Sequence, residues 1–117
     1  MKNPVIPGIN PEAALELLDG DTDIYMAILQ SFVTNTPPVI EALRNVTVET
    51  LPEYAVNIHG LKGICANIGA ALTGEKAREL EQLAKAGDLS GVIAGNNAFL
   101  EMTGKLVNDI KIFLEGK

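Results

Sequence analysis

Residues 51–69 of the chain read LPEYAVNIHGLKGICANIG, and their apolar side chains recur at the spacing of one helix face. A proline in the first turn and a glycine at the end are typical of the two boundaries of a helix. At about 100° per residue, one face collects the side chains that would enter a protein core. These side chains are Tyr54, Ile58, Leu61, Cys65 and Ile68. The stretch therefore predicts an amphipathic helix that opens after Thr50 and stops at Gly69.

Helix boundaries also occur on both sides of this stretch. Upstream, they predict helices over 10–19 and from 21 or 22 onward, and the pair Pro37-Pro38 restarts the chain as a third helix that runs to about 46. Downstream, they predict helices over 71–86 and from 88 to the end. No run alternates apolar and polar residues between tight turns, so strand signals are missing. The patterns predict an all-α domain, an antiparallel four-helix bundle with short additional N-terminal helices.

The last predicted helix carries two apolar stripes, each of which repeats every seven residues. The first consists of Val92, Phe99, Leu106 and Phe113, and the second of Ile93, Leu100, Val107 and Leu114. Two adjacent stripes predict a broad buried face, as in the core of a helical bundle.

Length and composition limit the class of protein. The chain of 117 residues, 47% of them hydrophobic, suffices for one domain over 1–117, which we expect to begin with an extended lead-in over about 1–9. A net charge of −6 with only nine Lys and Arg residues argues against nucleic-acid binding, which depends on basic side chains. No apolar run is long enough for a membrane span, and one His and one Cys do not make a metal site. We expect a cytoplasmic monomer without membrane contact or metal.

His59 is the single histidine, and the predicted helix places it roughly 150° from the centre of the apolar face. We therefore expect its imidazole to face solvent. An exposed helix face is normally rich in Glu, Lys and Gln, whereas the neighbours here are small or apolar apart from one cation. They are Ala55, Val56, Lys62, Gly63, Ala66 and Ala70. Such a flat surface favours the docking of another protein, and we expect Ala55, Val56, Ala66 and Ala70 to contact it.

The surroundings of His59 suit phosphoryl chemistry at its imidazole. A neutral imidazole is a good nucleophile near neutral pH. Lys62, one turn along, can offset the nearly two negative charges of a phosphoryl group, and Gly63 leaves the approach open. No Ser or Asp is placed to form a hydrolytic triad, and the phosphate-binding pattern GxxxxGK[ST] is absent. The sequence predicts a phosphocarrier rather than an enzyme, with Mg²⁺ and the acceptor aspartate supplied by its partner.

Residues 59–70 read HGLKGICANIGA, which closely resembles the signature of histidine phosphotransfer (HPt) domains, roughly H-x-L-K-G-x-x-x-x-x-G-A. The resemblance implies a four-helix bundle in which His59 is phosphorylated on the ring nitrogen farthest from the backbone. It implies that Lys62 lies near the phosphoryl group, that Gly63 keeps the imidazole accessible, and that Glu81 shapes the site. The family often has Gln or Glu at that last position, so Glu81 either holds Lys62 or repels the phosphoryl group.

The resemblance also implies partners and a setting. Partners would be response-regulator receiver domains, which carry the acceptor aspartate and the Mg²⁺. The relay would run from one receiver aspartate to His59 and on to another receiver aspartate in two-component signal transduction. The hybrid-sensor-kinase type of the family suggests either the cytoplasmic C-terminal domain of a membrane-bound kinase or a stand-alone protein.

Two alternatives stay open. One is a catalytically inert helical-bundle interaction module that keeps the fold without the relay. The other is the kinase-phosphorylated domain of a chemotaxis-type kinase, which would take its phosphoryl group from an ATP-binding domain rather than from a receiver.

Overall fold

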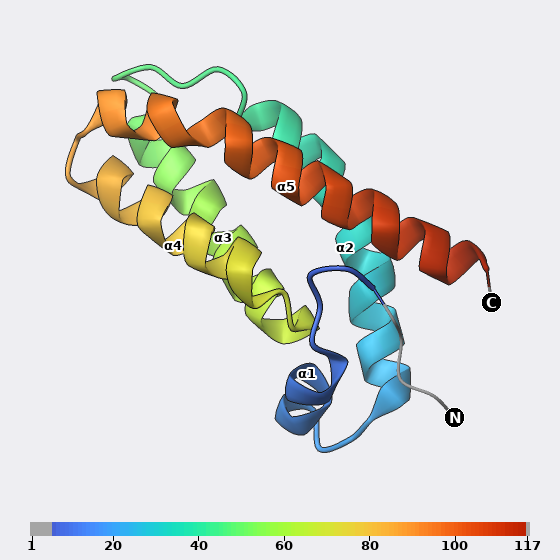
Figure 1. Cartoon of the computed structure of the whole chain (residues 1–117). Helices are drawn as coiled ribbons and strands as arrows, with labels where there is room; N and C mark the ends of the chain where they lie inside the picture. Colours follow the sequence, from blue (N-terminus) through green and yellow to red (C-terminus); the bar gives the residue numbers. More distant parts are fainter. Residues whose placement is uncertain (1–5, 117) are drawn as a thin grey trace.

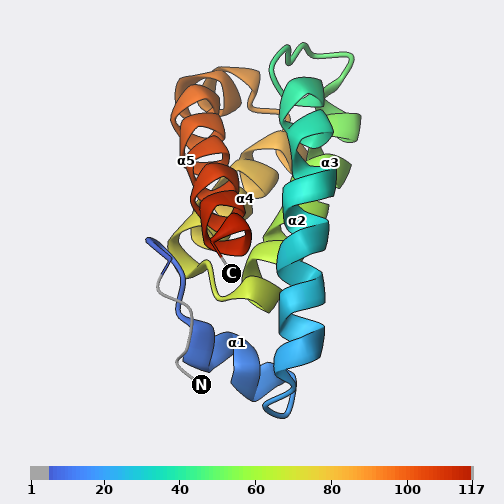
Figure 2. The same ribbon diagram turned by 90° about the vertical axis from the view of Figure 1, so that its right-hand side faces the viewer.

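The computed structural model describes residues 6–116, which form five α-helices and no strand. The short helix α1 (Pro11–Leu17) is followed by four longer ones. These are α2 (Thr22–Ala42), α3 (Leu51–Ile68), α4 (Ala71–Lys85) and α5 (Leu89–Glu115). The four long helices form the antiparallel bundle that the sequence predicts, with α1 across one end of α2 and α3 (Figures 1 and 2).

Three of the helices begin with a capping side chain at the position where the sequence predicts their start. Side-chain oxygens of Asn10, Asp21 and Asp88 accept hydrogen bonds from backbone N–H groups three residues ahead, at 3.2, 3.1 and 2.9 Å. At the other end of α3, Gly69 adopts a left-handed conformation with φ of 82° and stops the helix. A Cβ at Gly69 would overlap the carbonyl oxygen of Asn10, so the close approach of the N-terminal segment also requires glycine.

The predicted break at the proline pair is wrong. Helix α2 continues through Pro37 and Pro38, where the sequence predicted that a new helix starts. Both prolines lie on the exposed side of α2, so the carbonyl groups that lose their N–H partners can be hydrated. Phe32, Thr36 and Ile40 meanwhile continue the buried side across the same turns. One short helix rather than several therefore precedes the bundle.

The lead-in also differs from its prediction. Residues 1–5 lie outside the described part of the chain. Residues 6–9, predicted to be extended, form a turn in which the N–H of Ile9 donates to the carbonyl of Ile6 at 3.1 Å. Ile6 is buried and belongs to the core.

The core confirms the predicted face of α3 and, with the exception of Ile93, the predicted face of α5. Tyr54, Ile58, Leu61, Cys65 and Ile68 are all buried. On α5 the two stripes are buried at Val92, Phe99, Leu100 and Leu106, and Val107, Phe113 and Leu114 pack partly buried against the core. Ile93 of the second stripe is 55% exposed. The buried side of α5 also includes the polar side chains of Asn96 and Thr103, which the apolar stripes did not predict.

A buried hydrogen-bond chain fixes the register of three helices at one end of the bundle. The hydroxyl of Tyr54 on α3 donates to Oδ1 of Asn96 on α5 at 2.8 Å. The amide of Asn96 then donates to the carbonyl of Leu43, which caps α2, at 2.8 Å. Because buried polar groups are costly when unpaired, this chain favours one arrangement of the helices. It holds the half of α3 that precedes His59.

Candidate functional site

His59 lies where the periodicity of α3 predicts, on the side of the helix that faces solvent. Its side chain is 65% exposed, while Ile58 beside it is completely buried. The structure also brings Glu81 of α4 against the imidazole, because α3 and α4 pack closely along their length. The site therefore combines an exposed ring on α3 with a carboxylate from α4.

Glu81 is one of the few charged or polar side chains buried in the described chain, and its side chain is 4% exposed. It lies four residues after Ala77 and three before Ala84, so it shares the buried side of α4. Three groups donate to its carboxylate. Nζ of Lys62 is 2.7 Å from Oε1, while Nδ1 of His59 and Nζ of Lys85 are 2.8 and 3.0 Å from Oε2.

These donors keep the Glu81 carboxylate ionised. The hydrogen bond from Lys62 is the main cause that lowers the pKa of Glu81 from 4.5 to about 2, with further lowering by Lys85 and His59. Burial acts in the opposite direction, because it disfavours the charged form, and is outweighed. Near neutral pH the group is therefore a carboxylate that can only accept hydrogen bonds.

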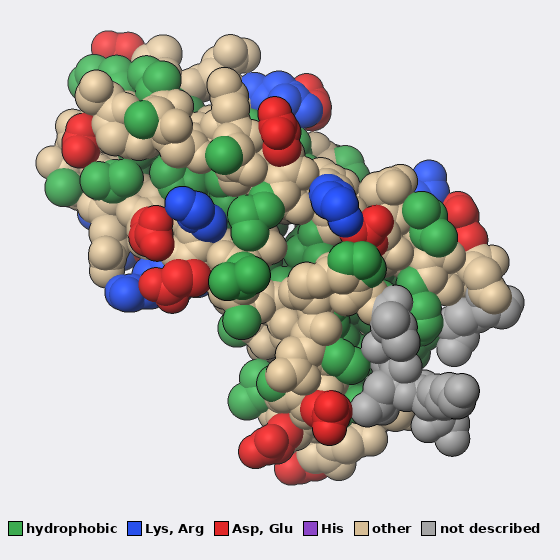
Figure 3. All heavy atoms as spheres, viewed as in Figure 1, with side chains coloured by type: hydrophobic (Ala, Val, Ile, Leu, Met, Phe, Trp, Pro, Cys, Tyr) green, Lys and Arg blue, Asp and Glu red, His purple; other side chains and the backbone are tan. Residues whose placement is uncertain are grey.

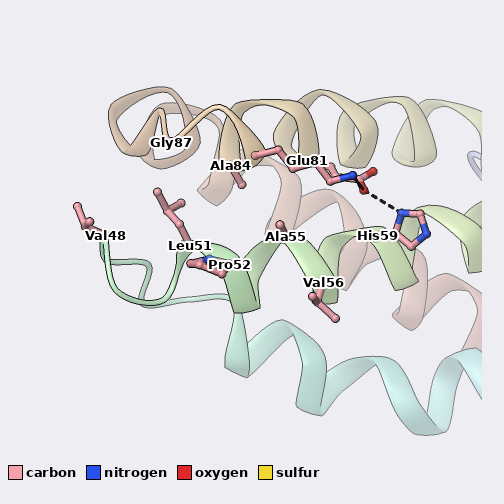
Figure 4. A pocket seen from close by; sticks show the side chains of 10 residues that line it. Val48, Leu51, Pro52, Ala55, Val56, His59, Glu81, Ala84 and Gly87 are labelled. Atoms are coloured by element: carbon pink, nitrogen blue, oxygen red, sulfur yellow. Dashed lines mark hydrogen bonds and ion pairs between the residues drawn. The ribbon is translucent and has the colours of Figure 1, made fainter.

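The contact with Glu81 determines the tautomer of a neutral His59 ring. Because the carboxylate only accepts, Nδ1 must carry the proton in the 2.8 Å hydrogen bond. The lone pair of the neutral ring then belongs to Nε2. Figure 4 shows this second nitrogen on the side of the ring that points away from α4. The arrangement presents a nucleophilic nitrogen to solvent and holds the ring from behind.

The surface on the C-terminal side of the ring is open. Gly63 lies one turn after His59 and is exposed, and a Cβ added there would meet no atom within 4 Å. Side chains on a helix lean towards its N-terminus, so a longer residue at this position would extend over the turn that carries His59. Glycine therefore leaves space for a group that approaches Nε2.

An apolar groove of about 730 Å³ adjoins the imidazole. It runs between α3 and α4, with His59 at one end and Val48 and Gly87 at the other (Figure 4). Val56 and Val48 on its rim are 71% and 64% exposed. The remaining lining residues are Leu51, Pro52, Ala55, Glu81, Ala84 and Lys85.

Two of the four predicted docking residues are not on an outer surface. Ala70 is completely buried, because the left-handed Gly69 ends the helix and turns the next residue inward. Ala55 is 8% exposed, because the side of α3 that it shares faces α4, and it contributes only to the lining of the groove. Val56 and Ala66 are exposed, as predicted.

Sequence reasoning missed Lys85 and the groove. Lys85 follows Glu81 by four residues, which is the ordinary spacing of a helical ion pair, and that spacing was the available signal. The groove has no such local signal, because it is formed where the loop before α3 and the turn after α4 come together.

Other features of the described residues bear on the class of site. Within residues 6–116, no cluster of three or more His, Cys, Asp and Glu side chains could hold a metal ion. None of the helices described combines the length and the apolar character needed to cross a membrane. On the face that Figure 3 shows, acidic and basic side chains lie beside one another over α4 and α5, in keeping with the pairs Lys76–Glu79 and Lys105–Asp109.

Comparison with known proteins identifies one family. The sequence model of the family described as Hpt domain matches residues 27–110, which is more than half of the chain and includes all the groups bound to Glu81. No curated protein and no solved structure matches the chain at a significant level.

Proposed function

Since the chain belongs to the Hpt domain family, we propose that it relays a phosphoryl group through Nε2 of His59. Hpt domains are phosphocarrier modules of two-component phosphorelays, and they generally interact with receiver domains. The observation that carries the proposal for His59 is the 2.8 Å hydrogen bond between its Nδ1 and Glu81. That bond leaves the exposed Nε2 as the nucleophile.

The proposed step begins with a receiver domain phosphorylated on its aspartate. The lone pair of Nε2 attacks phosphorus, the bond between phosphorus and the aspartyl oxygen breaks, and the receiver carboxylate leaves. No proton needs to move, since Nδ1 keeps its proton, and the ring takes up the positive charge that develops. Glu81 stabilises that charge at 2.8 Å from Nδ1. Attack by a second receiver aspartate reverses these bonds and carries the group onward.

Lys62 supplies the countercharge for the phosphoryl group in this proposal. Its ammonium already lies within one turn of His59, bound to Oε1 of Glu81 at 2.7 Å. A phosphoryl group brings up to two negative charges, so a preorganised cation lowers the cost of its arrival. We propose that the Mg²⁺ needed for the receiver's chemistry is held by the receiver itself.

The groove beside His59 supports a docking surface for the receiver. Its exposed rim at Val56 and Val48 and its buried lining at Leu51 and Ala84 offer apolar contact next to the nucleophile. Burial of such surface gives affinity, and its position aligns Nε2 with the incoming phosphoryl group. We propose this groove, together with the exposed Ala66 farther along α3 than His59, as the surface on which receiver domains dock.

The proposal is tested by mixing the protein with a panel of phosphorylated receiver domains. We expect transfer from at least one receiver, to give a phosphoryl label that is labile in acid and stable in base, and loss of the label in His59→Gln. A label that persists in this variant would show that another residue carries the group. A receiver that binds without transfer would support an inert interaction module, and labelling by a kinase and ATP without any receiver would support the chemotaxis-type alternative.

A further inference from the structure

Lys85 is the second cation bound to Glu81, and the transfer proposed above does not use it. It belongs to α4, four residues after Glu81, whereas Lys62 reaches the same carboxylate from α3. The buried carboxylate is thus neutralised from both helices. A single cation would balance its charge, so the second one needs a separate explanation.

The two lysines bind different oxygens. Lys62 has Oε1 to itself, while Lys85 shares Oε2 with Nδ1 of His59 at 3.0 and 2.8 Å. Lys85 therefore lies on the imidazole side of the carboxylate, and its ammonium and the ring nitrogen are separated by no more than these two contacts together. Lys85 is also part of the lining of the groove that adjoins the ring.

Exposure distinguishes Lys85 as the more mobile of the two cations. Its side chain is 64% exposed, against 32% for Lys62. Although its partner Glu81 is buried, the exposed ammonium can be hydrated when it leaves, and the four-carbon stem of lysine allows it to adopt other positions. Lys85 can leave Oε2 without disturbing the packing between α3 and α4.

Phosphorylation of the ring removes the excess of positive charge from the site. Two lysines and one carboxylate leave an excess of positive charge around the neutral imidazole. A phosphoryl group then adds close to two negative charges at Nε2. The nearest mobile cation is drawn to that group, and its departure leaves Oε2 of Glu81 to Nδ1 alone.

We propose that Lys85 is a second phosphoryl-stabilising residue, whose ammonium moves from Oε2 of Glu81 to the phosphoryl group on His59. This inference rests on the proposed function. The move pairs a cation with the phosphoryl group and leaves Oε2 of Glu81 to the Nδ1 proton. Lys85 thereby sets the lifetime of the phosphohistidine and the equilibrium with a receiver aspartate.

The test uses phosphoramidate, a small donor that transfers its phosphoryl group to histidine with loss of ammonia and requires no receiver. Wild type, Lys85→Met, Lys85→Arg and the control Lys76→Met are labelled, and the half-life of the label is measured at low and high salt. Lys76 is also an exposed lysine of α4, but it pairs with Glu79 away from the site. Methionine keeps most of the length of the unbranched side chain while it removes the charge.

We expect the half-life in Lys85→Met to be about threefold to tenfold shorter than in wild type at low salt, with the difference reduced at high salt. Lys85→Arg restores most of the lifetime and Lys76→Met leaves it unchanged. Equal half-lives for wild type and Lys85→Met, with His59 labelled in both, would overturn the role of Lys85 alone. Failure of wild type to accept the label on His59 would overturn the proposed function as well.

Discussion

Oε2 of Glu81 lies 2.8 Å from Nδ1 of His59, so a buried carboxylate on α4 holds an exposed ring on α3 by one of its two nitrogens. The same carboxylate binds Lys62 at 2.7 Å. Glu81 therefore links the nucleophile to its nearest countercharge. Of the two roles expected for Glu81, holding Lys62 is the one that the unphosphorylated site has.

Removal of the carboxylate should change the tautomer of His59. In wild type we expect the neutral ring to carry its proton on Nδ1, and in Glu81→Ala we expect it to shift towards the Nε2–H form that is usual without an acceptor at Nδ1. Nitrogen-15 NMR of the imidazole distinguishes the two forms. The matched control is Glu79→Ala, which removes an exposed carboxylate from the same helix. Indistinguishable ring spectra for wild type and Glu81→Ala would refute the account of the tautomer.

The lowered pKa of Glu81 predicts a dependence of stability on pH. A carboxyl group whose pKa falls from 4.5 to about 2 on folding stabilises the protein above the higher value and loses that contribution as the pH drops. The unfolding free energy of wild type relative to Glu81→Gln should therefore shrink by about 3 kcal/mol between about pH 5 and pH 2. Urea unfolding at a series of pH values measures this difference. A constant difference across the series would contradict the pKa shift.

Substitutions at Gly63 should affect the stability of the protein and the rate of phosphoryl transfer in different ways. No atom lies within 4 Å of an added Cβ, so Gly63→Ala should stabilise the helix by about 0.5–1 kcal/mol. Gly63→Leu should slow transfer from a receiver at least about tenfold, because the larger side chain extends over His59. A Cβ added at Gly104 of α5 would likewise meet no atom within 4 Å, so Gly104→Leu is the control and should leave transfer unchanged. If Gly63→Leu transfers at the wild-type rate, the open approach is not needed.

A charge on the groove rim should weaken docking without altering the nucleophile. Val56 is 71% exposed beside the groove, and we expect Val56→Asp to reduce transfer from a receiver about tenfold. Labelling by phosphoramidate should stay at the wild-type rate, because that donor needs no docking surface. Ile112→Asp, at a similarly exposed site outside the groove, serves as control. Equal losses with both donors would place the effect in the imidazole rather than in docking.

The sequence was sufficient for most of the fold because its helix boundaries are local. Asn10, Asp21 and Asp88 cap helices through their own side chains, and Gly69 ends one through its backbone. The proline pair misled the prediction because the effect of Pro37 on a helix depends on which side of it is solvated. That side is determined by packing against other helices.

The site was predictable only as far as one helix extends. Periodicity along α3 was enough to place His59 outside the core, because His59 and the apolar side chains that define the buried face belong to the same helix. It failed at Ala70, which lies beyond the turn at Gly69, and it could not show that Ala55 faces α4. The role of Lys85 depends on which oxygen of Glu81 it binds, and that follows from the approach of two helices rather than from spacing.

The most direct measurement is the identity of the atom that carries the phosphoryl group. Protein labelled with nitrogen-15 in histidine is treated with phosphoramidate, and the coupling between phosphorus and the ring nitrogens of His59 is measured by NMR. The account predicts coupling that identifies Nε2 as the bonded nitrogen, with the proton retained on Nδ1 beside Glu81. A phosphoryl group on Nδ1, or on any residue other than His59, would contradict it.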